Sequence, residues 1–241
     1  MLNLFFVEEL SEGPSCLVTG DEAHHAIKVL RMDVGEELLI SDGKGSWVRG
    51  EITNRAKSSF EMRILERGNS QFLTPKISVI QALPKHDRAK EAIELLTEAG
   101  VDKIIPWTSQ RSISQWQSDS KDKWRNGAVA ASKQSRRFDI PDIGEPFAFH
   151  KLPEMMTEGT VLLVLHEAAS EKMSEIFAAK QVDHLDHIIV VIGPEGGLTE
   201  NELQKFEQAG GKVALLGNPI FRSAHAGVAA LSAIQALIGR W

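Results

Sequence analysis

The sequence predicts an α/β protein of two domains: a small β-barrel at residues 1–72, then a parallel sheet covered by helices at residues 76–241. Two observations lead to this prediction. Short runs rich in apolar and β-branched residues fill roughly the first 70 positions, whereas the rest alternates continuous apolar runs with helical patterns. Continuous apolar strands joined by helical crossovers are typical of a parallel sheet buried on both faces.

The first domain is expected to be mostly β, because a barrel is the natural closure for many short strands. The segment SDGKGSW at residues 41–47 predicts a hairpin turn, since Asp-Gly supplies the positive φ values of tight turns. One helix is expected at residues 20–31, with acidic residues in its first turn and Arg31 in its last. The strands are expected within residues 3–7, 16–20, 36–41, 46–53 and 59–65.

The second domain follows a polar linker and is expected to contain five pairs of a strand and a helix. Gly100 should end the first of these helices, and Thr199 with Glu202 should form a capping box at the fourth. The strands are expected at residues 76–83, 103–107, 160–167, 187–193 and 212–217, and the helices at 88–100, 123–137, 170–180, 199–210 and 226–239.

The composition is that of an ordinary globular protein, with 42% apolar and 25% charged residues. No apolar run approaches the length of a membrane span, and the N-terminus meets acidic residues too soon for a secretory signal. The single Cys16 excludes an intramolecular disulfide and a cysteine metal site. We therefore expect a cytoplasmic protein with no membrane association and no metal.

The charge of the chain is unevenly distributed. The net charge is −6, but residues 76–137 carry 12 Lys and Arg against 7 Asp and Glu, and both flanking segments are acidic. Such a basic segment can mark a nucleic-acid partner, or it can be a set of solvated lysines on helix faces. Charge alone leaves both interpretations open.

Three expected strand ends are candidate ligand sites, because ligands of parallel sheets bind beyond the carboxyl ends of the strands. They read LVLHEAAS (163–170), VIGPEGGLTE (191–200) and LLGNPIFRSA (215–224). Neither common phosphate-loop pattern occurs in the chain. Gly196 and Gly197 could simply turn the chain, but three glycines and a proline favour a ligand that lies against bare peptide groups.

These motifs resemble the RsmE family of SPOUT-class methyltransferases, which methylate N3 of a uridine in 16S ribosomal RNA of the small ribosomal subunit. GPEGGLTENEL and LLGNPIFR, followed by an Ala-rich last helix, carry the likeness. HHAIKVLR followed by DGKG is similar to the family's PUA-like RNA-binding domain, and LPKHDRAKEAIELLTEAGVDKIIPW and AASKQSRR match its central elements. The resemblance covers essentially the whole chain.

The resemblance implies a PUA-like β-barrel, a SPOUT domain with a deep trefoil knot, and a homodimer whose active site is completed across the interface. It also implies S-adenosyl-L-methionine as cofactor, held largely by backbone groups of the knot loops. Carried over by position, the cofactor-binding residues are Leu165, His166, Ile192, Gly193, Pro194, Glu195, Gly196, Gly197, Leu216, Gly217, Ile220, Phe221 and Arg222.

The implied chemistry needs a group that stabilises a uridinate, because N3 is a poor nucleophile until its proton leaves. Arg222 could do so by hydrogen bonding a uracil carbonyl, or it could hold the cofactor carboxylate or a phosphate. His225 is expected in the first turn of the last helix, where the dipole favours a neutral ring that could accept the N3 proton. It could instead be a solvated residue. His166 with Glu167 could face a ligand or form a polar strand end.

Two positions depart from the family pattern. The chain reads FRSAHA where the family usually has Leu-Arg-Thr-Glu-Thr-Ala, so Ala224 replaces a glutamate, and Lys133 stands where many members have another. A non-catalytic RNA-binding or ribosome assembly factor, and a knotted methyltransferase with another RNA target, are therefore alternatives. The intact Gly-Pro-Glu-Gly-Gly loop and Arg222 favour an enzyme over a binder.

RNA contacts are expected from cations in or near the basic segment and from aromatic rings that stack on bases. Trp107, Trp116 and Trp124 lie in this segment, although Trp124 has helical spacing to Ala128 and Ala131, which favours core packing. The RNA-binding candidates are Arg31, Lys85, Arg88, Arg111, Lys133, Gln134, Arg136 and Arg137.

Overall fold

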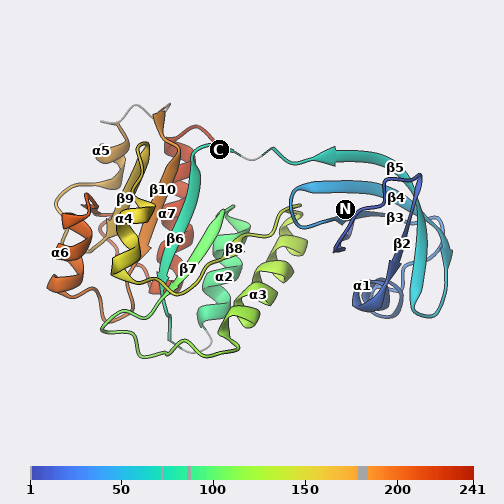
Figure 1. Cartoon of the computed structure of the whole chain (residues 1–241), viewed down its shortest axis with the longest axis horizontal. Coiled ribbons are helices and arrows are strands. Elements are labelled where there is room, and N and C mark those ends of the chain that lie inside the picture. Colours follow the sequence, from blue (N-terminus) through green and yellow to red (C-terminus); the bar gives the residue numbers. More distant parts are fainter. Residues whose placement is uncertain (1, 72, 86–87, 179–183) are drawn as a thin grey trace. The chain divides into compact units, whose positions relative to one another are not determined.

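The computed structural model describes residues 2–71, 73–85, 88–178 and 184–241. The chain forms two compact units (Figure 1). One unit comprises Met1–Phe72 and Ser132–Ile140, and the other comprises Leu73–Ala131 and Pro141–Trp241.

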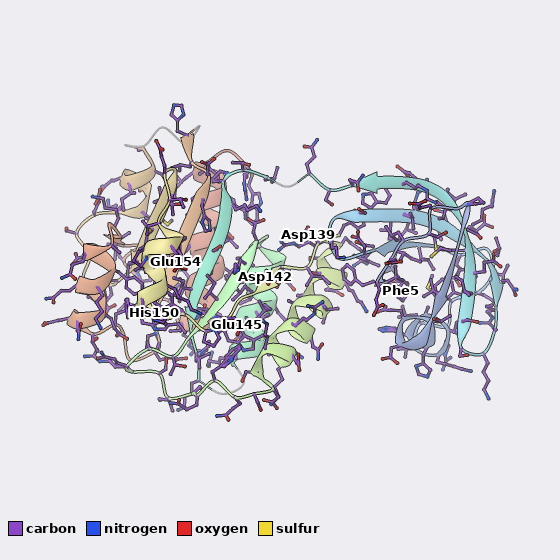
Figure 2. All side chains as sticks on the ribbon, in the orientation of Figure 1. Phe5, Asp139, Asp142, Glu145, His150 and Glu154 are labelled. Carbon is purple, nitrogen blue, oxygen red and sulfur yellow. The ribbon has the colours of Figure 1, made fainter. Side chains whose placement is uncertain are left out.

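The N-terminal unit is a five-stranded sheet in the order β1-β3-β4-β5-β2. β1 runs parallel to β3 and the other pairs are antiparallel. The sheet curls around an apolar core that includes Phe5 and Phe60 (Figure 2), and the described residues form no ladder between its edge strands, so the predicted barrel is a half-barrel. The strands are β1 (Leu4–Phe6), β2 (Ser15–Thr19), β3 (Glu37–Ser41), β4 (Ser46–Arg55) and β5 (Ser59–Asn69).

The predicted turn and helix of this unit are both present. Asp42 Oδ1 accepts hydrogen bonds from the backbone of Lys44 (2.7 Å) and Ser46 (3.1 Å), and Gly43 has a φ of 71°. The expected helix begins as α1 (Gly20–His24) but continues as a π-helix, η1 (His25–Val29), and Arg31 follows it with a φ of 57°. Arg31 therefore stands beyond the helix end and not in its last turn.

Residues 132–140 pack with the N-terminal unit, although they begin with the last turn of a helix, α3 (Ser120–Ser135), whose earlier residues belong to the C-terminal unit. Arg136 Nε donates to the Leu2 carbonyl at 2.7 Å, and the Phe138 ring stacks on Trp47 at 4.9 Å. These two contacts join the segment to the N-terminal unit. Within the segment, Arg137 forms an ion pair with Asp139 at 2.6 Å.

The C-terminal unit contains a parallel sheet, as the sequence pattern predicted, but the sheet has six strands where five were expected. Their order, which the sequence analysis did not predict, is β11-β9-β10-β6-β7-β8. Its central strands are buried along almost their whole length. β8 is a two-residue strand that no pattern indicated, and β11 is shorter than expected. The strands are β6 (Lys76–Ala82), β7 (Lys103–Trp107), β8 (Asp142–Ile143), β9 (Thr160–Leu165), β10 (His187–Ile192) and β11 (Lys212–Ala214).

Helices cover both faces of this sheet. α7 packs on β6, β10 and α2 behind the sheet in Figure 1, whereas α4 lies in front of it. Phe147, Phe149 and Phe206 surround Trp107 on the α4 face, with ring centroids 5.5–5.9 Å from the Trp107 ring. The helices are α2 (Arg88–Glu98), α3 (Ser120–Ser135), η2 (Phe149–Lys151), α4 (Leu152–Met155), α5 (Met173–Ala178), α6 (Glu200–Gln208) and α7 (Ser223–Leu237).

The predicted capping box of α6 is confirmed, and it extends to a third segment. Thr199 Oγ1 accepts from the Glu202 backbone at 3.3 Å, and Glu202 Oε2 accepts from the Thr199 backbone at 2.9 Å. Glu202 Oε1 accepts from the backbone of Gln110 at 2.8 Å, and the Glu202 residue is 2% exposed. One buried carboxylate thus ties the start of α6 to the segment after β7.

Glu202→Ala should lower the free energy of unfolding by about 1–3 kcal/mol, because the backbone N–H groups of Gln110 and Thr199 would lose the buried carboxylate that accepts from them. Denaturant unfolding measures this change. Glu207→Ala on the exposed face of the same helix is the matched control, expected within about 0.5 kcal/mol of the wild type. Equal effects of the two substitutions would contradict the role given to Glu202.

Candidate functional site

An open cavity of about 410 Å³ lies at the carboxyl ends of β9 and β10 and after β11. Its walls contain the three strand ends that the sequence singled out, together with the first turn of α7. The lining residues are Leu165, His166, Glu167, Ile192, Gly193, Pro194, Glu195, Gly197, Leu198, Leu215, Leu216, Gly217, Pro219, Ile220, Phe221, Arg222, Ser223 and Ala226.

The Gly-Pro-Glu-Gly-Gly loop turns sharply after β10 and is held from outside the cavity. Gly197 donates to the Pro194 carbonyl at 2.9 Å and has a φ of 71°, a conformation that favours glycine. Arg111 Nη1 donates to the Gly196 carbonyl at 2.9 Å, and a Cβ on Gly196 would lie 3.1 Å from Arg111 Cβ. Gly196 is therefore not a cavity-lining residue but lies against Arg111. Arg111, which was predicted to contact RNA, supports the loop.

The third wall is the segment after β11. Leu215 donates to the Glu171 carbonyl at 2.8 Å and accepts from Met173 at 3.0 Å, so this segment lies against the one after β9. A Cβ on Gly217 would meet no atom within 4 Å. Ile220 is 78% exposed and Phe221 46%, which leaves two large apolar side chains at the lip of the cavity.

A buried hydroxyl joins the walls. Ser223 Oγ donates to the Gly193 carbonyl at 2.7 Å and accepts from Gln81 Nε2 at 3.1 Å. Gln81 is completely buried on β6, next to β10. No sequence pattern pointed to Gln81, because a polar residue near the end of an apolar strand is not distinctive.

The two residues predicted to be catalytic have different positions. Arg222 lines the cavity, whereas His225 is not among the lining residues and turns toward α2, where its Nε2 lies 2.9 Å from Glu91 Oε1. The hydrogen bond from His225 lowers the pKa of the Glu91 carboxyl, and the charges of His225, Arg88 and Arg222 lower it further. Sequence reasoning missed Glu91, since nothing in a helix pattern links it to a residue 134 positions away.

His166 and Glu195 line the cavity, and each also accepts a hydrogen bond from a backbone N–H group. His166 Nδ1 accepts from the backbone of Ala168 at 3.2 Å, so His166 is a hydrogen-bonded strand end that also lines the cavity. Glu195 Oε1 accepts from the backbone of Lys85 at 3.2 Å, which connects the loop after β10 to the one after β6.

The structure does not bring all the predicted RNA-binding residues together. Lys85 and Arg111 bond to Glu195 and Gly196 of the loop after β10. Arg88 pairs with Glu91 of its own helix, α2, which in turn bonds His225. Arg31 and the segment with Lys133, Gln134, Arg136 and Arg137 belong to the other unit; Lys133 pairs with Glu22, and Arg136 and Arg137 hold that segment in place.

Two acidic side chains outside the cavity, which Figure 2 labels, are paired with lysines. Asp142 lies 2.8 Å from Lys103 Nζ, and Glu145 pairs with Lys121. Across residues 2–71, 73–85, 88–178 and 184–241, no three His, Cys, Asp or Glu side chains are grouped so as to hold a metal ion. No helix in the same ranges is long and apolar enough to cross a membrane.

Protein-family models match segments of both units of the chain. A family model described as an RNA methyltransferase domain matches residues 73–235, and one described as an RNA methyltransferase PUA domain matches residues 18–65. The chain is 35% identical to the ribosomal RNA small subunit methyltransferase E of Mycobacterium tuberculosis over 99% of this chain and 93% of that protein. The Bacillus subtilis protein of the same name is 29% identical, over 96% and 95%.

A solved structure is similar over its whole length. The crystal structure of a ribosomal RNA small subunit methyltransferase E from Neisseria gonorrhoeae, bound to S-adenosyl methionine, superposes with a TM-score of 0.87 at 27% identity and covers 98% of each chain. The resemblance seen in the sequence motifs is thereby confirmed. The chain belongs to the ribosomal RNA small subunit methyltransferase E family.

Proposed function

We propose that this protein transfers a methyl group from S-adenosylmethionine to N3 of a specific uridine in 16S ribosomal RNA of the small ribosomal subunit. The observation that carries the proposal is the cavity at three strand ends, with Arg222 on its wall. The relatives' name and the S-adenosyl methionine in the gonococcal structure support it.

The cavity residues suit this cofactor. Leu165, Ile192 and Leu216 offer apolar walls to an adenine ring, and the space beside Gly217 lets a ligand approach bare backbone. Glu167 and Glu195 place carboxylates on a wall that would meet a cationic ligand. The bound cofactor supplies an electrophilic methyl group on a sulfonium.

Arg222 is assigned the stabilisation of the uridinate. Its guanidinium can present a planar, permanently charged fork to a uracil carbonyl, which favours the deprotonated base. Because Ser223 is bonded to Gly193, the backbone next to Arg222 is fixed relative to the cofactor loop. This positioning keeps the cation where negative charge develops.

His225 is assigned the acceptance of the N3 proton, with Glu91 as its positioning partner. When the ring is neutral, a carboxylate at Nε2 keeps the hydrogen on that nitrogen and leaves Nδ1 as a proton acceptor. Ala224 cannot take this role, so the carboxylate on α2 supports the imidazole from the neighbouring helix.

The remaining architecture is proposed from the family. The N-terminal unit binds RNA as a PUA-like domain, and residues 76–241 form the methyltransferase domain. We assign a deep trefoil knot to the latter; the bonds of Leu215 to the segment after β9 and of Ser223 to the loop after β10 support it. A cytoplasmic homodimer would cover the exposed Ile220 and Phe221 at the cavity lip.

Gly217→Val should weaken S-adenosylmethionine binding at least tenfold, because the new side chain would occupy the space beside the open glycine. Isothermal titration calorimetry measures the dissociation constant. Gly13→Val in the N-terminal unit is the control. Normal cofactor affinity in a folded Gly217→Val variant would remove the cavity as the cofactor site. Gly196→Val is a poorer test, since its Cβ would also press on Arg111.

Arg222→Ala should slow single-turnover methyl transfer about 10²–10³-fold while the cofactor dissociation constant changes little. Arg222→Lys keeps the charge but loses the fork, so it should recover only part of the rate. If Arg222→Ala instead weakens cofactor binding and leaves the rate at saturation intact, the arginine holds the cofactor and not the base.

His225→Ala should slow transfer about 10²-fold, because the variant would lack the group that is assigned to accept the N3 proton. Glu91→Gln should slow transfer in the same direction by a smaller factor. Single-turnover rates with saturating cofactor measure both effects. A wild-type rate for His225→Ala would show that the histidine has no catalytic role.

A further inference from the structure

A second hollow of about 400 Å³ lies in the C-terminal unit, between α2, α3 and the segment before α3. Ile93 and Gly127 stand where the two helices approach, since a Cβ on Gly127 would lie 3.6 Å from Ile93 Cγ2. Trp116 and Trp124 form another wall. Nothing in the methyl-transfer chemistry above uses this hollow.

Trp116 is held in place but not fully covered. Its ring meets Trp124 edge to face at a centroid distance of 5.1 Å, and Trp124 is buried. Ser114, two residues earlier, donates to the Pro84 carbonyl at 2.8 Å and anchors the segment. Trp107 and Trp124 are core residues, whereas Trp116 is partly exposed and lines the hollow. A positioned, accessible indole beside an empty volume is a stacking platform.

The rim carries cations that can reach a phosphate. Lys90 and Lys123 line the hollow with side chains 75% and 72% exposed, in ion pairs with Glu94 (3.6 Å) and Asp119 (2.8 Å). Exposed ion pairs of this kind contribute little to stability, so the lysines can exchange a carboxylate for a phosphate. Asp119 then remains as an acceptor for an amino or imino hydrogen on a base edge.

The hollow adjoins the first cavity. Pro84 lines the hollow, and the backbone of the next residue, Lys85, donates to Glu195 on the cavity wall. The same helix, α2, carries Lys90 at the hollow and Glu91 at His225. A strand of RNA whose target base enters the first cavity would therefore have a neighbouring nucleotide within reach of the second.

We propose that this hollow binds an unpaired base of the RNA near the methylated uridine, stacked on Trp116, with flanking phosphates at Lys90 and Lys123. The inference rests on the proposed RNA substrate. It assigns Trp116 to substrate binding and not to methyl transfer.

Trp116→Ala should raise the KM for unmodified 16S ribosomal RNA about tenfold or more, because stacking on an aromatic ring contributes several-fold to a hundredfold in affinity. The kcat and the cofactor dissociation constant should stay at wild-type values. Trp241→Ala removes another exposed tryptophan, outside the hollow, and should leave KM unchanged.

A second variant keeps the test decisive if Trp116→Ala does not fold. Ala89→Leu adds bulk to the hollow from the α2 wall and should raise KM in the same direction. The double variant Lys90→Ala, Lys123→Ala should reduce the slope of log binding constant against log salt concentration by about two, because two phosphate contacts would be lost. Wild-type KM in folded Ala89→Leu, or in folded Trp116→Ala, would overturn the proposal.

Binding of a fluorescent, unmodified 16S ribosomal RNA transcript, followed by anisotropy, separates this inference from the proposed activity. If the wild type binds the transcript but transfers no methyl group, the proposed function fails while the hollow is still tested by the same variants. If transfer is normal and the variants bind the transcript as the wild type does, the hollow is not an RNA site.

Discussion

The Ser223 hydroxyl is the constraint on which the site depends. Its bonds to the Gly193 carbonyl and the Gln81 amide join the first residue of α7 to the ends of β10 and β6. Ser223 is a buried residue and Gln81 is completely buried, so water has little access to the bond between them. Arg222 and His225 flank Ser223 closely in the chain, and their backbone positions are therefore set by the end of the central strands rather than by a mobile loop.

Two further bonds support the Gly-Pro-Glu-Gly-Gly loop from outside the cavity. Arg111 donates to the Gly196 carbonyl, and Glu202 accepts from the backbone of Gln110 beside it. The segment after β7 thus supports the C-terminal end of the turn. Arg111, which the sequence analysis proposed as an RNA contact, therefore has a structural role in this loop.

The local features of the fold could be predicted from the sequence, and the long-range ones could not. Asp42-Gly43, the Thr199 capping box and the apolar strands carry their signals within a few residues. The return of residues 132–140 to the N-terminal sheet depends on bonds such as Arg136 to Leu2. The motifs at three predicted strand ends indicated where the cavity lies. The Glu91–His225 pair joins two helices that are far apart in the sequence, so no motif or residue spacing could have predicted it.

The identity and position of the transferred methyl group test the central claim most directly. Purified protein would be incubated with isotopically labelled S-adenosylmethionine and 16S ribosomal RNA from a strain lacking the corresponding enzyme, and nuclease fragments would be read by mass spectrometry. If the protein methylates N3 of one specific uridine, the label will appear in one N3-methyluridine at a single site. Label on another atom or nucleoside, or no label with RNA and cofactor both bound, would contradict it.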